Sequence, residues 1–224
     1  CTHCYNETKC KPVPLYDMIS FIDRWNLVYK DTFFVFHGGE PFMRNISDII
    51  TLSKHMKTFR VTSNMTIPLS DEHIEFLKTC KVRTTSFDIG IRFGSITNLN
   101  RWIHNMKKLY KMDIPLQMTI CLTTHILNVS PEKFVRFMKW LPVATVNFEY
   151  ITYTGRGINI KDIVPKHVEI DQWLLSLYQY MEKHRITREQ FNVLNFYQLA
   201  SAYYRNFSET RCIECCKRMF TVNP

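Results

Sequence analysis

Cysteine groups at both ends of the chain have the residue types and spacing best suited to chemistry. The chain opens on CTHCYN, with two residues between Cys1 and Cys4. A second group, Cys212, Cys215 and Cys216, stands near the other end. A spacing of two residues lets one turn of chain direct both sulfurs at one metal ion or iron–sulfur cluster. Each end therefore predicts a metal or cluster site, with a zinc knuckle or incidental thiols as alternatives for the second group.

The other cysteines do not suggest a disulfide framework. The chain has 8 cysteines in 224 residues, and they gather at the ends. Cys80 closes a helical pattern and Cys121 lies in an apolar strand-like run. Buried free thiols are expected at both positions, and such thiols fit a reducing compartment.

The composition is ordinary for a globular protein, with 46% apolar and 22% charged residues. No run approaches the roughly 18 consecutive apolar residues of a membrane span, so no membrane partner is expected. The formal charge of +9 permits an acidic partner such as nucleic acid. The basic residues lie mostly in stretches such as HNMKKLYK and MEKHRITR, however, which favours solvated helix faces.

Short apolar strands and amphipathic helices alternate along the first 150 or so residues. Strands are predicted at FFVFHGGEP, FRVTSN, VRTTSFDIG, LQMTICLTTHI and TVNFEYITY. The helices between them include one capped by Ser70 and one capped by Ser130 with Pro131 in its first turn. This order predicts an α/β fold with a parallel sheet and helices packed outside it. Beyond residue 155 the alternation stops, and DQWLLSLYQYMEKH and REQFNVLNFYQLASAYYRNF predict two further helices.

Small or polar residues stand at the ends of the predicted strands, where parallel sheets bind ligands. They are Gly38, Gly39, Glu40 and Pro41 after the first strand, Thr62, Ser63 and Asn64 after the second, Ser86 and Asp88 after the third, and Tyr153, Gly155 and Arg156 after the fifth. A glycine pair lets a ligand approach the backbone closely, and a glutamate suits a cationic group. Taken singly, each motif is also typical of a tight turn or a helix cap.

In combination, these motifs resemble the radical S-adenosylmethionine (SAM) enzymes, and within them the branch with a C-terminal SPASM or twitch extension. The resemblance rests on CTHCYN, GGEP one helix later, TSN, SFD and GRG at successive strand ends, and CIECCKRMFTVNP. It covers essentially the whole chain. It implies a partial (β/α)6 barrel of the TIM type, with residues 1–160 as the radical SAM core. Residues 161–224 would then be a helical linker and the start of the extension.

The resemblance also implies the cofactors. The family signature is C-x-x-x-C-x-x-C, and its three thiolates hold a [4Fe-4S] cluster whose fourth iron binds SAM. Cys1 and Cys4 match the second and third cysteines, so the first is expected four residues before Cys1, with the first strand upstream of it. Cys212, Cys215 and Cys216 would be ligands of an auxiliary cluster, with the remaining ligands downstream.

Further residues match positions that contact SAM in the family. Gly38, Gly39 and Glu40 would line its amino group, and Pro41 would fix the turn. His3 would lie near the adenine, Ser86 and Asp88 near the ribose or carboxylate, and Asn64, Tyr153, Gly155 and Arg156 at neighbouring strand ends. Met65, Phe87 and Ile89 depart from the family pattern, because glycine is common at the first and third positions and an aliphatic residue at the second.

By the same resemblance, the expected activity is reductive cleavage of SAM to a 5'-deoxyadenosyl radical that abstracts hydrogen from a peptide or protein. Sulfatase-type maturation and crosslinking of a ribosomally made peptide are examples. Flavodoxin or ferredoxin would supply the electron, in the cytoplasm. An RNA-modifying radical SAM enzyme is an alternative that the positive charge favours. A zinc-dependent nucleic-acid-binding module and a catalytically inactive barrel scaffold are alternatives from other classes.

Overall fold

A single parallel sheet forms the centre of the protein. The computed structural model describes residues 13–37, 39–87, 95–151 and 160–196. The sheet has six strands in the order β1-β2-β3-β4-β5-β6, and every neighbouring pair is parallel. The strands are β1 (Phe33–Phe36), β2 (Thr58–Ser63), β3 (Val82–Ser86), β4 (Leu116–Cys121), β5 (Val143–Glu149) and β6 (Asn192–Val193). The predicted α/β fold with a parallel sheet is confirmed.

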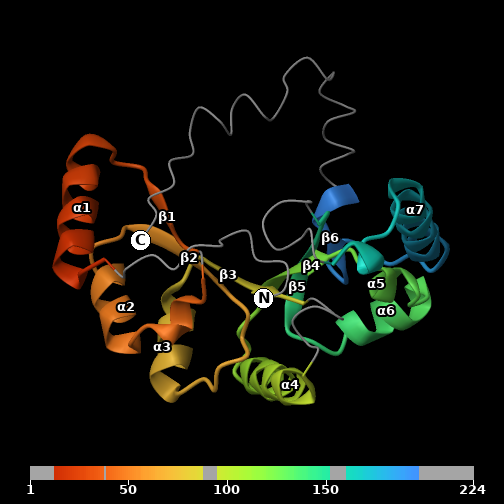
Figure 1. Ribbon diagram of the computed structural model, residues 1–224, viewed down its shortest axis with the longest axis horizontal. Coiled ribbons are helices and arrows are strands. Elements are labelled where there is room, and N and C mark those ends of the chain that lie inside the picture. The colour runs from red at the N-terminus through yellow and green to blue at the C-terminus, as the bar shows by residue number, and fades with distance from the viewer. Residues whose placement is uncertain (1–12, 38, 88–94, 152–159, 197–224) are drawn as a thin grey trace.

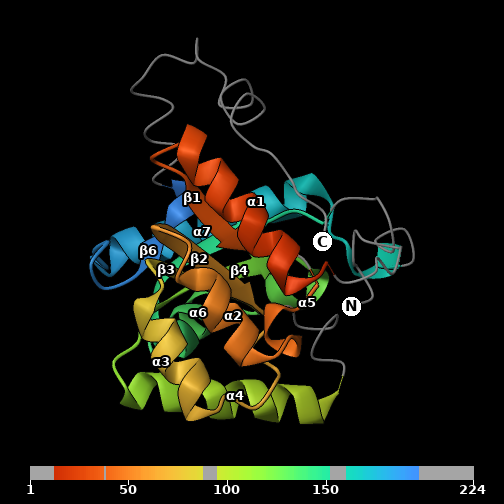
Figure 2. The same ribbon diagram turned by 90° about the vertical axis from the view of Figure 1, so that its left-hand side faces the viewer.

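Helices line the outer side of this sheet (Figure 1). They are α1 (Leu15–Val28), α2 (Ile46–Ser53), α3 (Asp71–Thr79), α4 (Ile96–Lys111), α5 (Thr124–Leu127), α6 (Pro131–Met138) and α7 (His167–Lys183), with the short 3-10 helix η1 (Pro41–Met43). Each connecting helix joins neighbouring parallel strands by a right-handed crossover. When the strand order follows the chain order, such crossovers place all the helices on the same face of the sheet. The sheet therefore has a helix-covered convex face and an opposite concave face, as in a partial (β/α) barrel. Figure 2 shows α1, α2 and α3 in front of β1 and β2.

The convex face of the sheet and the helices enclose the hydrophobic core. In β2, Phe59 and Val61 are buried, and the Phe59 ring stacks on Phe76 of α3 at 5.6 Å. In β3, the Thr85 hydroxyl accepts a hydrogen bond from the Trp102 indole of α4 at 3.2 Å. Because successive side chains of a strand point to opposite faces, the residues between these positions lie on the concave face.

The predicted helix caps are confirmed. Ser70 and Ser130 begin α3 and α6, and each hydroxyl accepts a hydrogen bond from a backbone N–H three residues on. Cys80 ends α3 and is 3% exposed, and burial raises the pKa of its thiol to about 12. The prediction of a buried free thiol is therefore confirmed for Cys80, whereas Cys121 is only partly buried.

Two elements differ from the sequence-based expectation. LQMTICLTTHI was expected to be one strand, but β4 ends at Cys121 because Thr123 caps the short helix α5, accepting a hydrogen bond from the N–H of Ile126. A helix was expected around residue 192, but Asn192–Val193 form β6 instead. The Asn192 amide donates to the Thr145 hydroxyl of β5 at 3.1 Å, and Val193 is buried. Pairing with the exposed edge of β5 therefore outweighed local helix propensity.

The described residues beyond position 160 also pack on this sheet. The Trp173 ring of α7 meets the rings of Phe134 and Phe148 at 5.3 and 5.5 Å. The division of the chain at residue 160 stays a prediction. None of the helices in the described part of the chain combines the length and apolar character that a bilayer crossing requires.

The first turn of α3 should make stability depend on pH. The Nδ1 atom of His73 accepts a hydrogen bond from the Ser70 backbone N–H at 3.2 Å, which it cannot do when protonated. Burial is the main cause that lowers the pKa of His73 below 6.5. The unfolded chain therefore binds more protons than the folded one near this pH. The stability that neutral His73 contributes is complete above pH 6.5 and is lost as the pH falls through the lower, folded-state pKa.

We expect His73→Gln to flatten this pH dependence, because the Gln oxygen can keep the capping box at every pH. The measurement is the urea midpoint of both proteins at several values between about pH 5 and pH 7.5. His104→Gln, at an exposed position on α4, is the matched control and should keep the wild-type slope. An unchanged slope in His73→Gln would contradict the assignment.

Candidate functional site

The described site residues gather at one edge of the sheet. Gly39, Glu40 and Pro41 follow β1, Asn64 follows β2, and Ser86 ends β3. Because these strands are parallel neighbours, their carboxyl ends meet at the same edge. The remaining predicted site residues lie outside the described residues: Cys1, His3, Cys4, Gly38, Asp88, Tyr153, Gly155, Arg156, Cys212, Cys215 and Cys216. Within the described ranges, no three His, Cys, Asp or Glu side chains form a metal-ligand group.

Glu40 links the end of β1 to the end of β2. Its Oε1 atom accepts hydrogen bonds from the Ser63 hydroxyl at 2.7 Å and from the Phe42 N–H at 3.2 Å. Its Oε2 atom accepts one from the Asn64 N–H at 2.7 Å. Ser63 is only 2% exposed, so the carboxylate satisfies a hydroxyl that water does not reach. Sequence reasoning assigned Glu40 a contact with SAM and missed this second, structural contact.

The Glu40 carboxylate keeps some capacity for a ligand. A carboxylate oxygen has two lone pairs, and Oε2 uses one of them for Asn64. The remaining acceptor position and the negative charge suit an ammonium group. The predicted contact between Glu40 and a SAM amino group is thus compatible with the geometry and stays a prediction.

The backbone of Gly39 adopts a left-handed conformation with φ of 56°. A side chain at this position would meet no heavy atom within 4 Å. The preference for glycine is therefore conformational, since L-residues with a Cβ atom are strained in this region. After this turn, Glu40 caps η1 and Pro41 occupies its first position.

The loop after β2 is held by a buried side chain of α4. Asn105 is 1% exposed, and its amide donates to the carbonyls of Met65 at 2.9 Å and Ile67 at 2.7 Å. Met65 has φ of 52°, the left-handed region that favours glycine, although its side chain is fully buried. This conformation explains why glycine would suit this position. Nothing in the local sequence identified Asn105 as a functional residue.

Asn64 and Ser86 have polar atoms available at the edge. The Asn64 side-chain oxygen accepts hydrogen bonds from the Thr66 N–H at 2.9 Å and the Thr66 hydroxyl at 2.6 Å. Within the described part of the chain, its amide nitrogen and the Ser86 hydroxyl have no hydrogen-bond partner. Phe87, the next residue, turns to the convex face, where its ring lies 5.0 Å from that of Trp102. The edge therefore presents one carboxylate, one amide donor and one hydroxyl.

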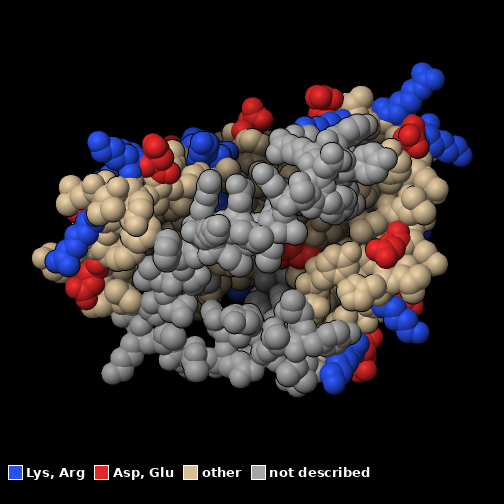
Figure 3. Space-filling view, turned by 90° about the horizontal axis from the view of Figure 1, so that it is seen from above, with Lys and Arg blue, Asp and Glu red and all other residues tan. Residues whose placement is uncertain are grey.

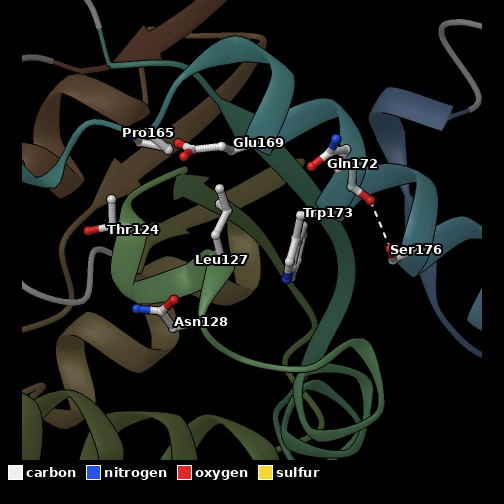
Figure 4. Close-up of a pocket in the computed structure, with 8 residues that line it drawn as sticks. All are labelled: Thr124, Leu127, Asn128, Pro165, Glu169, Gln172, Trp173 and Ser176. Carbon is white, nitrogen blue, oxygen red and sulfur yellow. Dashed lines mark hydrogen bonds between the residues drawn. The ribbon is translucent and has the colours of Figure 1, made fainter.

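A cavity of about 350 Å³ lies between α5 and α7, away from these residues (Figure 4). Three of its polar lining groups already have partners, among them the Ser176 hydroxyl, which donates to the Gln172 carbonyl at 2.8 Å. The Glu169 carboxylate accepts a hydrogen bond from the Lys166 N–H at 2.7 Å, and the Trp173 indole donates to the Val129 carbonyl at 2.9 Å. None of the site residues within the described ranges lines this cavity, so the sheet edge is the better candidate.

Comparison with known proteins identifies solved structures that share this fold. No family model matches the sequence, and no curated protein is detectably similar to it. The chain resembles the solved structure of native anSMEcpe with bound AdoMet at a TM-score of 0.74 and 15% identity, over 91% of this chain and 62% of that one. The anSMEcpe structure with AdoMet and the Cp18Cys peptide gives 0.74 and 16%, over 91% and 61%. Streptococcus suis SuiB bound to the precursor peptide SuiA gives 0.62 and 16%, over 86% and 45%.

These likenesses cover part of the other proteins. The chain spans 62% of the length of anSMEcpe and 45% of that of SuiB in these superpositions. At such low sequence identity, the likeness establishes the fold alone. That fold is the partial barrel that the sequence predicted.

Proposed function

We propose that the chain, whose fold is that of the radical SAM enzymes, is the core of one that modifies a peptide or protein. The observation that carries this proposal is the likeness, over 91% of the chain, to a structure with bound AdoMet. The Gly39–Pro41 turn is held against the end of β2 at the edge where parallel sheets bind ligands. Two of the similar structures also contain peptides, Cp18Cys and SuiA, which favours a peptide substrate.

The side chains at the sheet edge fit SAM, whose amino acid part carries an ammonium and a carboxylate. The Glu40 carboxylate and the Gly39 carbonyl would accept hydrogen bonds from the ammonium. The Asn64 amide nitrogen would donate to the carboxylate or ribose, and the Ser86 hydroxyl would bond the same part of the cofactor. When bound, SAM and a [4Fe-4S] cluster would supply a 5'-deoxyadenosyl radical by one-electron reduction.

The remaining assignments belong to the same proposal. Cys1 and Cys4 would ligate the cluster together with a cysteine upstream, and flavodoxin or ferredoxin would reduce it in the cytoplasm. Cys212, Cys215 and Cys216 would serve an auxiliary cluster in a SPASM-like extension. His3, Gly38, Asp88, Tyr153, Gly155 and Arg156 would complete the SAM site.

The charges of the described residues seen on one face do not favour an RNA substrate. On the face seen from above, Lys and Arg side chains are interspersed with Asp and Glu around the periphery (Figure 3). RNA binding depends on cations that neutralise several phosphates at once. The excess of basic residues is better explained by solvated helix faces.

The test uses the full-length protein, purified and reconstituted with iron and sulfide under anaerobic conditions. We expect a broad visible charge-transfer absorption and release of 5'-deoxyadenosine when SAM and dithionite are added. Cys4→Ala should lose both signals, whereas Cys80→Ala, at a buried thiol before the amino end of β3, should keep them. Stoichiometric zinc binding without 5'-deoxyadenosine would favour the nucleic-acid-binding module. A residue other than cysteine four positions before Cys1 would favour the inactive scaffold.

A further inference from the structure

A row of uncharged polar side chains crosses the concave face of the sheet. The strand register places Thr62 of β2 beside Thr84 of β3, and Thr84 beside Gln117 of β4. It continues from Gln117 to Thr145 of β5 and from Thr145 to Asn192 of β6. With neighbouring strands about 4.8 Å apart, the row spans about 19 Å. An extended chain of about six residues has this length.

The concave orientation of the row follows from its neighbours. Thr85 bonds to Trp102 of α4 on the convex face, so Thr84 points the other way. Val61 is fully buried beneath the helices, so Thr62 also points to the concave face.

The hydroxyl of Thr84 is buried and has no hydrogen-bond partner among the described residues. Thr84 is 8% exposed, and no described residue forms a hydrogen bond with its side chain. The other buried polar side chains in the described ranges are all bonded: Ser63 to Glu40, Thr85 to Trp102, Asn105 to Met65 and Ile67, and Thr123 to Ile126. Because burial of an unpaired hydroxyl destabilises a fold, such a group is most readily explained by a ligand that completes it.

The described strands place few charges on the concave face. Among the described strand residues that point to this side, Arg60 and Glu149 are the charged ones: Arg60 lies in the middle of β2, two residues before Thr62, and Glu149 is the last residue of β5. The next level of the sheet pairs Ser86 with Thr119 and Thr119 with Asn147, again neutral hydrogen-bonding groups. Phosphates would need cations here, whereas hydroxyls and side-chain amides match the N–H and C=O groups of a peptide.

We infer that Thr84 and its row bind the main chain of an extended peptide substrate across the concave face. This inference rests on the proposed function and goes further by naming the groups that hold the substrate. Ser86 lies two residues along β3 from Thr84, about 7 Å toward the cofactor edge. A peptide on the row therefore lies within reach of a radical formed at that edge.

The test compares full-length wild type, Thr84→Val and Thr84→Ser, each with cluster and SAM. The probes are a fluorescein-labelled pool of acetylated, amidated decapeptides without charged residues, and decauridylate of the same length. We expect Thr84→Val to raise the apparent Kd for the peptides about 5- to 10-fold, and Thr84→Ser to stay within about twofold. Release of 5'-deoxyadenosine without peptide should be the same in all three proteins.

Thermal unfolding provides a readout that separates binding from structure. The melting temperature of ligand-free Thr84→Val should equal or exceed that of wild type, because valine removes an unpaired hydroxyl and keeps the shape. If the three proteins release 5'-deoxyadenosine normally and bind the peptides with equal affinity, this inference is refuted and the proposed function is not. The same holds if wild type binds none of the peptides. A lower melting temperature with unchanged affinity would show a structural hydroxyl, and tighter binding of decauridylate would favour RNA. Wild type that releases no 5'-deoxyadenosine would instead refute the proposed function.

Discussion

Replacing Glu40 by alanine is expected to lower the free energy of unfolding by about 2–4 kcal/mol. The change removes the acceptor for the Ser63 hydroxyl and for the N–H groups of Phe42 and Asn64. Ser63 is 2% exposed, so its hydroxyl would be left without a partner and without water. The ends of β1 and β2 would then lose the contact that joins them. Urea denaturation of the two proteins measures the difference.

Two further variants identify the cause of this loss. Glu40→Gln keeps the size and one acceptor oxygen, so about half the loss is expected. Ser63→Ala combined with Glu40→Ala in a double-mutant cycle should give a coupling free energy of at least about 1 kcal/mol. Glu75→Ala is the matched control, because Glu75 is exposed and its ion pair is with Lys78, and it should stay within about 0.5 kcal/mol of wild type. A similar small effect for Glu40→Ala would contradict a structural role of the carboxylate.

The same substitution bears on the proposed SAM site. Glu40 positions the Gly39–Pro41 turn relative to Asn64, so its loss would displace several groups of the site at once. We therefore expect Glu40→Ala to weaken SAM binding more than Asn64→Ala, measured by equilibrium dialysis of labelled SAM with the full-length protein. Equal affinities of the two variants would indicate that the turn keeps its place without the carboxylate.

Asn105→Leu is expected to lower the free energy of unfolding by about 3 kcal/mol. Leucine has the same number of side-chain heavy atoms and the same branching but leaves the buried carbonyl of Met65 and that of Ile67 without donors. The Leu69 N–H, which lies 3.4 Å from the Asn105 oxygen, loses its acceptor as well. Without these bonds, the loop could leave the left-handed conformation at Met65. Adopting that conformation costs a non-glycine residue about 1–2 kcal/mol.

The control for this prediction lies one turn earlier on the same helix. Asn100 is exposed, so Asn100→Leu should change the unfolding free energy by about 0.5 kcal/mol or less. Asn105→Asp should be at least as destabilising as Asn105→Leu, because a carboxylate has no proton to donate to two carbonyls. Wild-type stability in Asn105→Leu would show that the loop carbonyls find other donors.

The alternation of strands and helices could be predicted because its signals are local. Apolar periodicity marks β2 and α4, and Ser70 and Ser130 mark helix starts by bonding a backbone N–H three residues away. The same local signals failed where a distant partner decided the outcome. Residue 192 lies in a helical pattern, but its partner on β5 is 47 residues away.

The candidate site divides in the same way. The amino-acid sequence by itself determined the GGEP turn and the polar residues at the strand ends, because residue types and order carry that pattern. Only the tertiary structure decided that Glu40 bonds to Ser63 and Asn64, 23 and 24 residues away. It also decided that Asn105 holds the loop at Met65 and that Thr84 is buried with no partner in the part of the chain that the structure describes. Such contacts depend on how strands align and which face the helices cover, and local periodicity does not encode either.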